Sequence, residues 1–290
     1  MKVLNRQLKE NPGLENRMFN IEKHTRTFIS AKKGGNGGEG KGGNNNNTSG
    51  GTVLPVNDGF GTINIPVYIY VVYSNSYQNL SDERINSQIT VLNNDFNDLS
   101  YDDIPEEFQG VAADVDINFT LATTDRRADS TFSWGTNSSL QSAYPAVSGH
   151  LTIWVANIGG GILGYAQFPG GNASTDGVVI DPVCFGTAGN LNAPYDKGRT
   201  ATHEVGHWLN LRHIWGDGKC GQDDFVGDTP SSDRPNYGNP TYPTVNCRSN
   251  DMTMNYMDYT DGTCMNMFSH DQKNRMRAIF SDGGPRASMR

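Results

Sequence analysis

The sequence predicts an α+β domain, in which an α/β half is followed by a half made mostly of loops. Three observations predict this class. Apolar residues recur with strand and helix periods between residues 60 and 158, and three of the six histidines lie in one helical segment after residue 200. About forty residues beyond that segment show no periodicity at all. The chain has 290 residues, 35% of them hydrophobic, which is enough for one domain with additional segments.

The expected elements follow in chain order. Residues 63–71 carry apolar side chains at every second position, which predicts a half-buried strand. Ser81 is a candidate N-cap for the helix that follows, where apolar residues recur at helical spacing. Residues 115–121 alternate as a second strand. A third begins at Leu151 and ends at the three glycines 159–161.

The N-terminal part has a different composition. Residues 1 to about 30 are polar with loosely spaced apolar residues, which predicts helix, and Pro12-Gly13 breaks it. Residues 34–51 contain no apolar side chain, so they cannot form a packed core. We therefore expect a helical region at 1–33, a Gly/Asn-rich linker at 34–52 and the globular domain at 53–290.

Charge and hydropathy exclude two classes of partner. The net charge is −8 and the pI is near 5.2, and no block of Lys or Arg provides a surface for nucleic acid or acidic lipid. No run of about 18 apolar residues occurs, so no membrane span is expected. The sequence gives no indication of the oligomeric state.

The four cysteines are Cys184, Cys220, Cys247 and Cys264, and no two form a C-x-x-C pair. This pattern disfavours a thiolate zinc site and permits disulfides, which would indicate an oxidising compartment; four free buried thiols are the alternative. The N-terminus has no apolar segment of a signal peptide. Either a leader has been removed or the protein is cytosolic. We expect a secreted protein, because a Gly/Asn-rich chain with paired cysteines fits secretion better.

The segment HEVGHWLNLRH, residues 203–213, contains the main candidate site. Residues four apart share one helix face, so His203 and His207 can bind a single ion, and Glu204 is turned about 100° from His203, beside that ion. Zinc held by three protein ligands lowers the pKa of its bound water to about 7, and a nearby carboxylate can take the proton. This arrangement predicts a zinc hydrolase.

The third ligand requires the helix to end. In a continuous helix, His213 would lie about 9 Å beyond His207 along the axis and some 240° around it, out of reach of the same metal. Asn210 stands where a glycine would most easily take the left-handed conformation that reverses the chain. Asparagine is the non-glycine residue best tolerated there. We therefore expect a positive φ at Asn210.

Less specific interpretations also exist. A lone His-Glu-x-x-His can arise by chance on a solvated helix, but here a third histidine, a turn residue and an apolar helix face accompany it. The remaining histidines have no such context and are expected to be surface or capping residues: His24, His150 and His270.

The motif and its surroundings resemble a known family. HEVGHWLNLRHIWGD resembles the extended zinc motif of metzincin metallopeptidases, and the chain is most similar to the pappalysin family, including the secreted bacterial cytophagalysins. The similarity extends over most of residues 60–285, notably LTIWVANIGGGILGYAQFPGG, CGQDDFVGDTP and NYMDYTDGTCMNMFSHDQKNRMR. It implies a metzincin-like zincin fold, with a twisted mixed β-sheet and two main helices above the cleft. The loop-rich lower subdomain would end in a C-terminal helix near 270–280.

The resemblance assigns roles to residues of the site. His203, His207 and His213 would bind zinc, and Glu204 would be the general base and acid for a zinc-bound water. Met257 would form the Met-turn beneath the metal. Tyr259 would stabilise the oxyanion, as a phenol donor can; a merely buried tyrosine is the alternative.

Further roles lie outside the helix. Residues 160–164 would belong to an edge strand that pairs with an extended substrate: Gly160, Gly161, Ile162, Leu163 and Gly164. Asp224 and Thr229 match a calcium loop, for which a solvated acidic loop is the alternative. Cys220 and Cys247 match a family disulfide, which leaves Cys184 with Cys264 as a weaker pair.

Two departures from the family pattern stand out. Asn210 replaces the usual glycine. Residues 1–33 resemble the family's pro-segment but contain no cysteine, so latency through a thiolate on the zinc cannot operate. A carboxylate ligand or steric cover would have to keep the zymogen inactive.

The sequence therefore predicts a secreted zinc endopeptidase that hydrolyses internal bonds of protein or peptide substrates. Zn²⁺ is the expected cofactor, together with Ca²⁺. The alternative is a non-catalytic metal-binding or adhesin-like module, although a structural zinc site has no need of Glu204. An excess of acid between Asp217 and Asp228 is compatible with basic substrates, but it defines no pocket.

Overall fold

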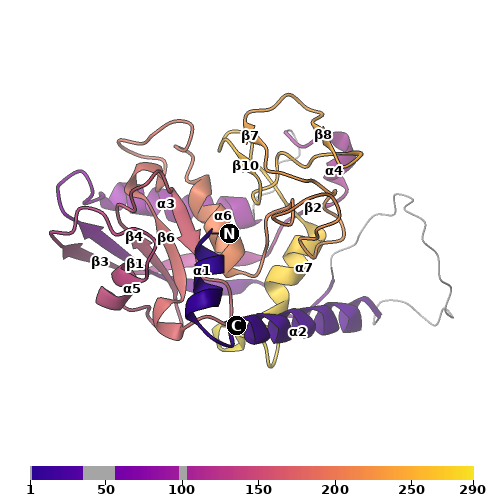
Figure 1. Cartoon of the computed structure of the whole chain (residues 1–290), viewed down its shortest axis with the longest axis horizontal. Helices are drawn as coiled ribbons and strands as arrows, with labels where there is room; N and C mark the ends of the chain where they lie inside the picture. Colours follow the sequence, from indigo (N-terminus) through magenta and orange to yellow (C-terminus); the bar gives the residue numbers. More distant parts are fainter. Residues whose placement is uncertain (1, 35–55, 98–102) are drawn as a thin grey trace.

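The computed structural model describes residues 2–34, 56–97 and 103–290 (Figure 1). Except for Gly34, the expected linker lies outside the described residues. In the described part, a sheet and its helices form one half and a loop-rich region with a C-terminal helix forms the other.

A five-stranded mixed sheet forms the centre of the first half. Its order is β3-β1-β4-β6-β5, and all neighbours are parallel except β5, which runs antiparallel to β6 at the edge. The strands are β1 (Ile63–Tyr73), β3 (Ile117–Ala128), β4 (Leu151–Val155), β5 (Gly164–Ala166) and β6 (Gly177–Ile180). The α+β class expected from the sequence is confirmed.

The strand expected at 115–121 differs in its bounds. Val115 donates its N–H to the carbonyl of Phe96, and Asp116 has a φ of 59°, so the strand begins only at Ile117. It then continues to Ala128 beside β1, past the end of the apolar alternation. Pairing along the whole length of β1, rather than the local pattern, sets the length of β3.

Two helices cover one face of the sheet, α3 (Asp82–Asn97) and α6 (Arg199–Trp208). Fully buried side chains of α3 and α6, such as Phe96 and Val205, pack with the inward residues of β1. The opposite face carries a smaller apolar cluster around Trp154, which α5 (Ser139–Ala143) and Val3 help to cover. The sheet thus presents its larger apolar face to the helix that carries the zinc motif.

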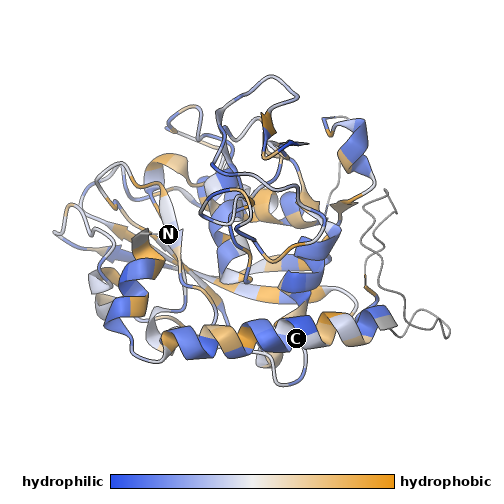
Figure 2. Ribbon diagram, turned by 45° about the vertical axis from the view of Figure 1, so that its right-hand side comes forward, coloured by the Kyte–Doolittle hydropathy of each residue, from blue (hydrophilic) through white to orange (hydrophobic). Residues whose placement is uncertain are grey.

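The N-terminal region forms two helices, α1 (Lys2–Glu10) and α2 (Leu14–Gly34), and the break falls at Pro12-Gly13 as predicted. α2 packs against the C-terminal helix α7 (His270–Ala278). Figure 2 shows α2 along one side of the molecule, with hydrophobic and hydrophilic residues mixed along its length. α2 is therefore attached to the second half through α7.

Loops dominate the second half. α7 begins with a capping box between Ser269 and Gln272, and Arg277 on this helix forms a buried ion pair with Asp58.

The remaining elements of the described chain are short: α4 (Glu106–Gln109), β2 (Ala112–Ala113), η1 (Ala173–Thr175), η2 (Pro182–Cys184), β7 (Tyr237–Gly238), β8 (Val245–Asn246), β9 (Ser249–Asn250), β10 (Tyr259–Thr260), β11 (Phe268–Ser269) and η3 (Ala287–Met289).

Within the residues that the structure describes, none of the helices combines the length and the apolar character needed to cross a membrane.

Candidate active site

The helix α6 carries the first half of the site and is fixed at its base by one buried carboxylate. Asp95 on α3 accepts hydrogen bonds from the Nε of Arg199 (2.9 Å) and the hydroxyl of Thr202 (2.6 Å). It also accepts one from the hydroxyl of Tyr256 (3.1 Å). Asp95 therefore ties α6 both to α3 and to the segment that precedes Met257.

The helix ends in a Schellman motif. Asn210 has a φ of 78°, and its N–H donates to the carbonyl of His207, while the N–H of Leu211 donates to the carbonyl of Gly206. The positive φ expected at Asn210 is confirmed. Because this turn reverses the chain, His213 returns to the histidines of α6.

Three imidazoles converge beyond this turn. Nitrogen atoms of His203, His207 and His213 all lie within 4.8 Å of one another, and the Nε2 atoms of the last two are 3.1 Å apart. Burial lowers the pKa of His203 to about 4 and lowers the pKa values of the other two well below the usual range. The three rings are therefore neutral, the form that binds a metal.

Each Nδ1 atom has an acceptor that fixes the tautomer. His203 Nδ1 lies 2.8 Å from the carbonyl of Tyr256, and His207 Nδ1 lies 2.8 Å from the carbonyl of Leu211. His213 Nδ1 lies 2.6 Å from a carboxylate oxygen of Asp217. With a proton on each Nδ1, the three Nε2 lone pairs are free to bind one ion, so the donor set fits zinc.

Asp217 is a site residue that the sequence analysis missed. It belongs to the acidic stretch that was associated with basic substrates, but its carboxylate orients His213. The indole of Trp215 stacks on the same imidazole, with centroids 4.2 Å apart and planes 6° apart. The spacing of four residues between His213 and Asp217 was the available signal.

Met257 lies directly beneath the helix. It is fully buried, and a Cβ atom added to Gly206 would come within 2.5 Å of its sulfur. The absence of a side chain at Gly206 therefore lets the thioether pack against α6 at the level of the histidines. The Met-turn role of Met257, which the resemblance implies, stays a prediction.

Glu204 is buried beside the edge strand. A Cβ atom on Gly164 of β5 would lie 3.0 Å from the Cγ of Glu204, so the glycine leaves room for this side chain. Burial raises the pKa of Glu204 to about 8. A bound cation next to it would favour the ionised form.

Tyr259 is partly exposed, and its ring contacts the same histidines. Its centroid lies 5.5 Å from that of His203 and 4.9 Å from that of His213. Desolvation, followed by the nearby Glu204 carboxylate, raises the pKa of its phenol, which remains a hydrogen-bond donor. His203, Glu204 and Tyr259 line the same cavity, of about 340 Å³.

The predicted edge strand is shorter than expected. Only Gly164 of residues 160–164 belongs to β5, because Gly159, Gly160 and Gly161 have positive φ values and form a turn. Gly161, Ile162, Leu163 and Gly164 nevertheless line the cavity. The turn, rather than a strand, therefore borders this part of the cleft.

The structure brings the predicted calcium residues together. The Thr229 hydroxyl donates to Asp224 at 2.8 Å, and the N–H of Val226 donates to the other carboxylate oxygen at 3.1 Å. Burial raises the pKa of Asp224 to about 7. Asp228 instead accepts from Ser269 and from the N–H of Asp271 at the start of α7.

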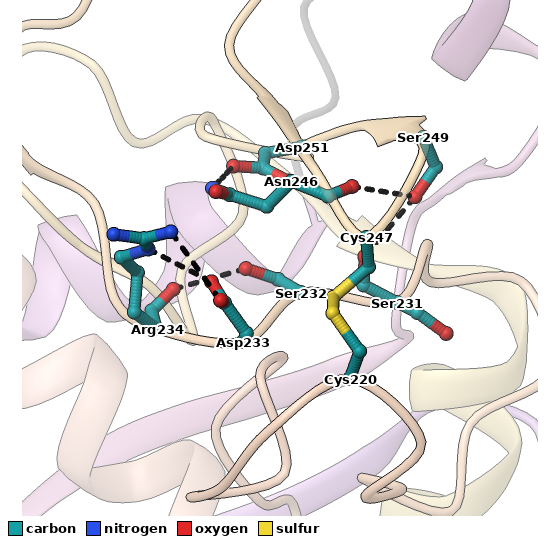
Figure 3. The surroundings of a disulfide bond; sticks show 9 residues. All are labelled: Cys220, Ser231, Ser232, Asp233, Arg234, Asn246, Cys247, Ser249 and Asp251. Carbon is teal, nitrogen blue, oxygen red and sulfur yellow. Dashed lines mark hydrogen bonds and ion pairs between the residues drawn. A yellow bond between two sulfur atoms is a disulfide. The ribbon is translucent and has the colours of Figure 1, made fainter.

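One of the two expected disulfides forms. Cys220 and Cys247 are bonded and link two parts of the loop region (Figure 3). The pairing of Cys184 with Cys264 is wrong, since both thiols are free. Cys184, the last residue of η2, contacts the carbonyls of Leu163 and Asp181, and Cys264 contacts the carbonyl of Thr253.

The remaining histidines lie away from this centre. His24 pairs with the hydroxyl of Ser281, His150 contacts the carbonyl of Ser148, and His270 is the first residue of α7.

Comparison with known sequences finds metalloprotease relatives of this chain. Residues 154–281 match the peptidase family described as Pregnancy-associated plasma protein-A. Extracellular metalloprotease 1 of Coccidioides posadasii is 31% identical over 75% of this chain and 77% of its own length. An extracellular metalloprotease of Arthroderma benhamiae is 32% identical over 74% of this chain and 76% of its own length.

Solved structures give closer matches. Mature mirolysin of Tannerella forsythia in complex with a cleaved peptide is 43% identical, with a TM-score of 0.75, and the match covers 79% of this chain and 96% of that one. A promirolysin mutant from the same organism is 36% identical, with a TM-score of 0.80, over 98% of this chain and 94% of that one.

The turn at Asn210 can be tested by substitution. Asn210→Gly should keep zinc affinity close to that of the wild type, because glycine adopts the same φ. Asn210→Val should weaken zinc binding, since a β-branched residue at this φ costs of order 1–3 kcal/mol. Calorimetric zinc titration of the chelator-treated proteins measures both. Equal affinity of the valine and glycine variants would show that the turn does not place His213.

Proposed function

Because the chain belongs to the pappalysin family and is a zinc metalloendopeptidase, we propose that Glu204 and Tyr259 carry its hydrolytic chemistry. The observation that supports this most is that His203, one member of a cluster of three neutral imidazoles, lines one cavity together with a buried glutamate and a phenol. The relatives are named proteases, so the alternative of a non-catalytic module gains no support.

His203, His207 and His213 would hold the zinc ion. When bound there, zinc supplies Lewis acidity that acidifies water and polarises a peptide carbonyl. The chain's contribution is to keep the three rings neutral and oriented. Two backbone carbonyls and Asp217 do this through the Nδ1 atoms.

Glu204 is the proposed general base and acid. Glu204 lines the cavity, and it directly follows the proposed ligand His203 in the chain. It would accept a proton from the attacking water and then pass this proton to the leaving amine nitrogen. No side chain of the protein becomes acylated, because water itself attacks the carbonyl carbon.

Tyr259 is the proposed oxyanion donor. Its ring is held between two histidines and Trp215, whose centroid is 4.8 Å away. A phenol fixed in this way can donate a hydrogen bond to the carbonyl oxygen as negative charge develops there.

A peptide substrate would bind along β5 and the turn before it. β5 is an edge strand, so one side of its backbone is available for main-chain pairing. Gly164 allows a close approach to Glu204. The mirolysin structure with a cleaved peptide supports peptide or protein substrates for this chain.

We also propose a calcium ion at Asp224 and Thr229. Asp224 is 4% exposed, and its carboxylate accepts hydrogen bonds only from the uncharged groups of Thr229 and Val226 among the described contacts. A buried carboxylate of this kind is stabilised by a nearby cation, and calcium prefers such oxygen ligands.

Residues 1–33 are proposed to be a pro-segment. Promirolysin matches 98% of this chain but mature mirolysin matches 79%, which supports a removable N-terminal part. Val3 packs with the apolar cluster that includes Tyr165 of β5. Among the described residues, the histidine cluster contains no carboxylate, and no residue of 2–34 lines the cavity beside it.

Secretion is the proposed location. The relatives are named extracellular metalloproteases, and the disulfide is typical of oxidising compartments. We expect the protein to accumulate in the medium of the producing cells rather than in the cell lysate.

Glu204→Ala should abolish casein cleavage and retain zinc, because the proton acceptor is lost and the three ligands remain. Tyr259→Phe should lower kcat by about 10²-fold or more with little change in KM, since the phenol acts on the transition state. Peptide cleavage rates and zinc content of the purified variants test this. Retention of wild-type activity by Glu204→Ala would refute the proposed mechanism.

Calcium should raise the melting temperature of the wild type. At a hundredfold excess over Kd, the expected stabilisation is about 2.7 kcal/mol. Asp224→Asn should lose the effect, whereas Asp223→Asn, an exposed neighbour, should retain it. Thermal melts with calcium, magnesium or a chelator provide the measurement. An identical calcium response in both variants would argue against the site.

Weakening the attachment of α2 should ease activation. Glu22 binds Arg275 on α7 with both carboxylate oxygens, at 2.8 and 3.2 Å. Glu22→Ala should therefore shorten the lag before the full chain cleaves a peptide, and proteolysis within the Gly/Asn-rich segment should remove the lag. Glu15→Ala, at an exposed position of α2, is the matched control. Full activity of the uncut wild-type chain would contradict a pro-segment.

A further inference from the structure

The cavity beside the candidate active site extends to one side of the histidine cluster. His203 and Glu204 line it, but His207 and His213 do not. Its remaining walls come from the turn before β5, the segment before α6 and the residues after Met257. They include Lys197, Arg199, Asp258 and Gly262.

Glu204 indicates which part of a substrate this cavity receives. In the proposed function, on which this step rests, Glu204 passes a proton to the leaving amine. The substrate residue that departs with this amine therefore lies on the Glu204 side of the metal site. The cavity is thus placed to receive the side chain on the carboxyl-terminal side of the cleaved bond.

Two charged residues of the cavity wall are already bound to the protein. Arg199 pairs with Asp95, and its Nη1 donates to the carbonyls of Gly262 (3.0 Å) and Met265 (2.8 Å). Asp258 accepts hydrogen bonds from the backbone and side chain of Asn236. Neither residue presents an unsatisfied charge to a substrate.

Lys197 differs from both. Its stem crosses Gly262, since a Cβ atom there would lie 3.0 Å from the Cβ and 3.3 Å from the Cγ of Lys197. The side chain is 45% exposed, and its ammonium is 3.5 Å from the carboxylate of Asp196. That distance is at the limit of a hydrogen bond, so the ammonium retains donors for another acceptor.

We propose that Lys197 makes this subsite selective for an acidic side chain, aspartate or glutamate, directly after the cleaved bond. The stem lies against Gly262, and Lys197 lines the cavity. A carboxylate there gains a charge-assisted hydrogen bond, while a substrate lysine or arginine meets a like charge. The overall acidity of the chain does not set this preference, because the local cation does.

Four quenched fluorescent peptides that differ only after the cleaved bond (Glu, Gln, Lys or Ala) test the proposal on the zinc-loaded full chain after activation. The wild type should cleave the Glu peptide roughly fivefold better than the Gln peptide in kcat/KM, and better still than the Lys peptide. Lys197→Glu should reverse the order of Glu and Lys, and Lys197→Arg should keep it. Ratios between peptides cancel any change in the amount of folded enzyme.

Lys219→Glu is the matched control, since Lys219 is exposed and lies outside the cavity wall. It should keep the wild-type order of peptides, and mass spectrometry confirms the cleaved bond. If the wild type cuts the Ala peptide but its kcat/KM is no higher for the Glu peptide than for the Lys peptide, the role of Lys197 is overturned and the proposed function stands. An unchanged order in Lys197→Glu does the same. A zinc-loaded protein that cuts none of the four peptides overturns the proposed function as well.

Discussion

The reversal of the chain at Asn210 is the constraint on which the metal site depends. Two imidazoles can share an ion from one helix face, but the third must come from beyond the helix end. The same turn supplies the carbonyl of Leu211 that holds His207, so it both returns His213 and fixes the ring of another ligand. A left-handed residue at this one position thus decides whether the site exists.

The turn is held by parts of the molecule that are distant in sequence. Arg275 of α7 donates to the carbonyl of Asn210, and the Asn210 side chain is 3.4 Å from the Thr25 hydroxyl on α2. Arg275 in turn binds Glu22. The N-terminal helix, the C-terminal helix and the end of the active-site helix therefore form one polar network, and α2 contacts the zinc-binding region without lying in the cleft.

The acidic residues around the cleft have different roles. Asp95, Asp217 and Asp258 are acidic residues close to the site, yet each is engaged by donors of the protein itself. Glu204 lies beside them without such a partner among the described hydrogen bonds, as a proton carrier requires. A count of charges along the sequence cannot separate these tasks, because the task depends on which donor each carboxylate meets.

The sequence by itself determined the ligands His203 and His207, the neighbouring Glu204 and the left-handed Asn210, because helix geometry and turn chemistry act over a few residues. It also indicated the class of the fold and the Cys220–Cys247 disulfide through resemblance. Tertiary structure alone decided which carbonyl accepts the hydrogen bond of His203 and which residue Lys197 packs against. It also decided that Cys184 and Cys264 stay free thiols. These depend on backbone carbonyls and close approaches between distant segments, which leave no local pattern in the sequence.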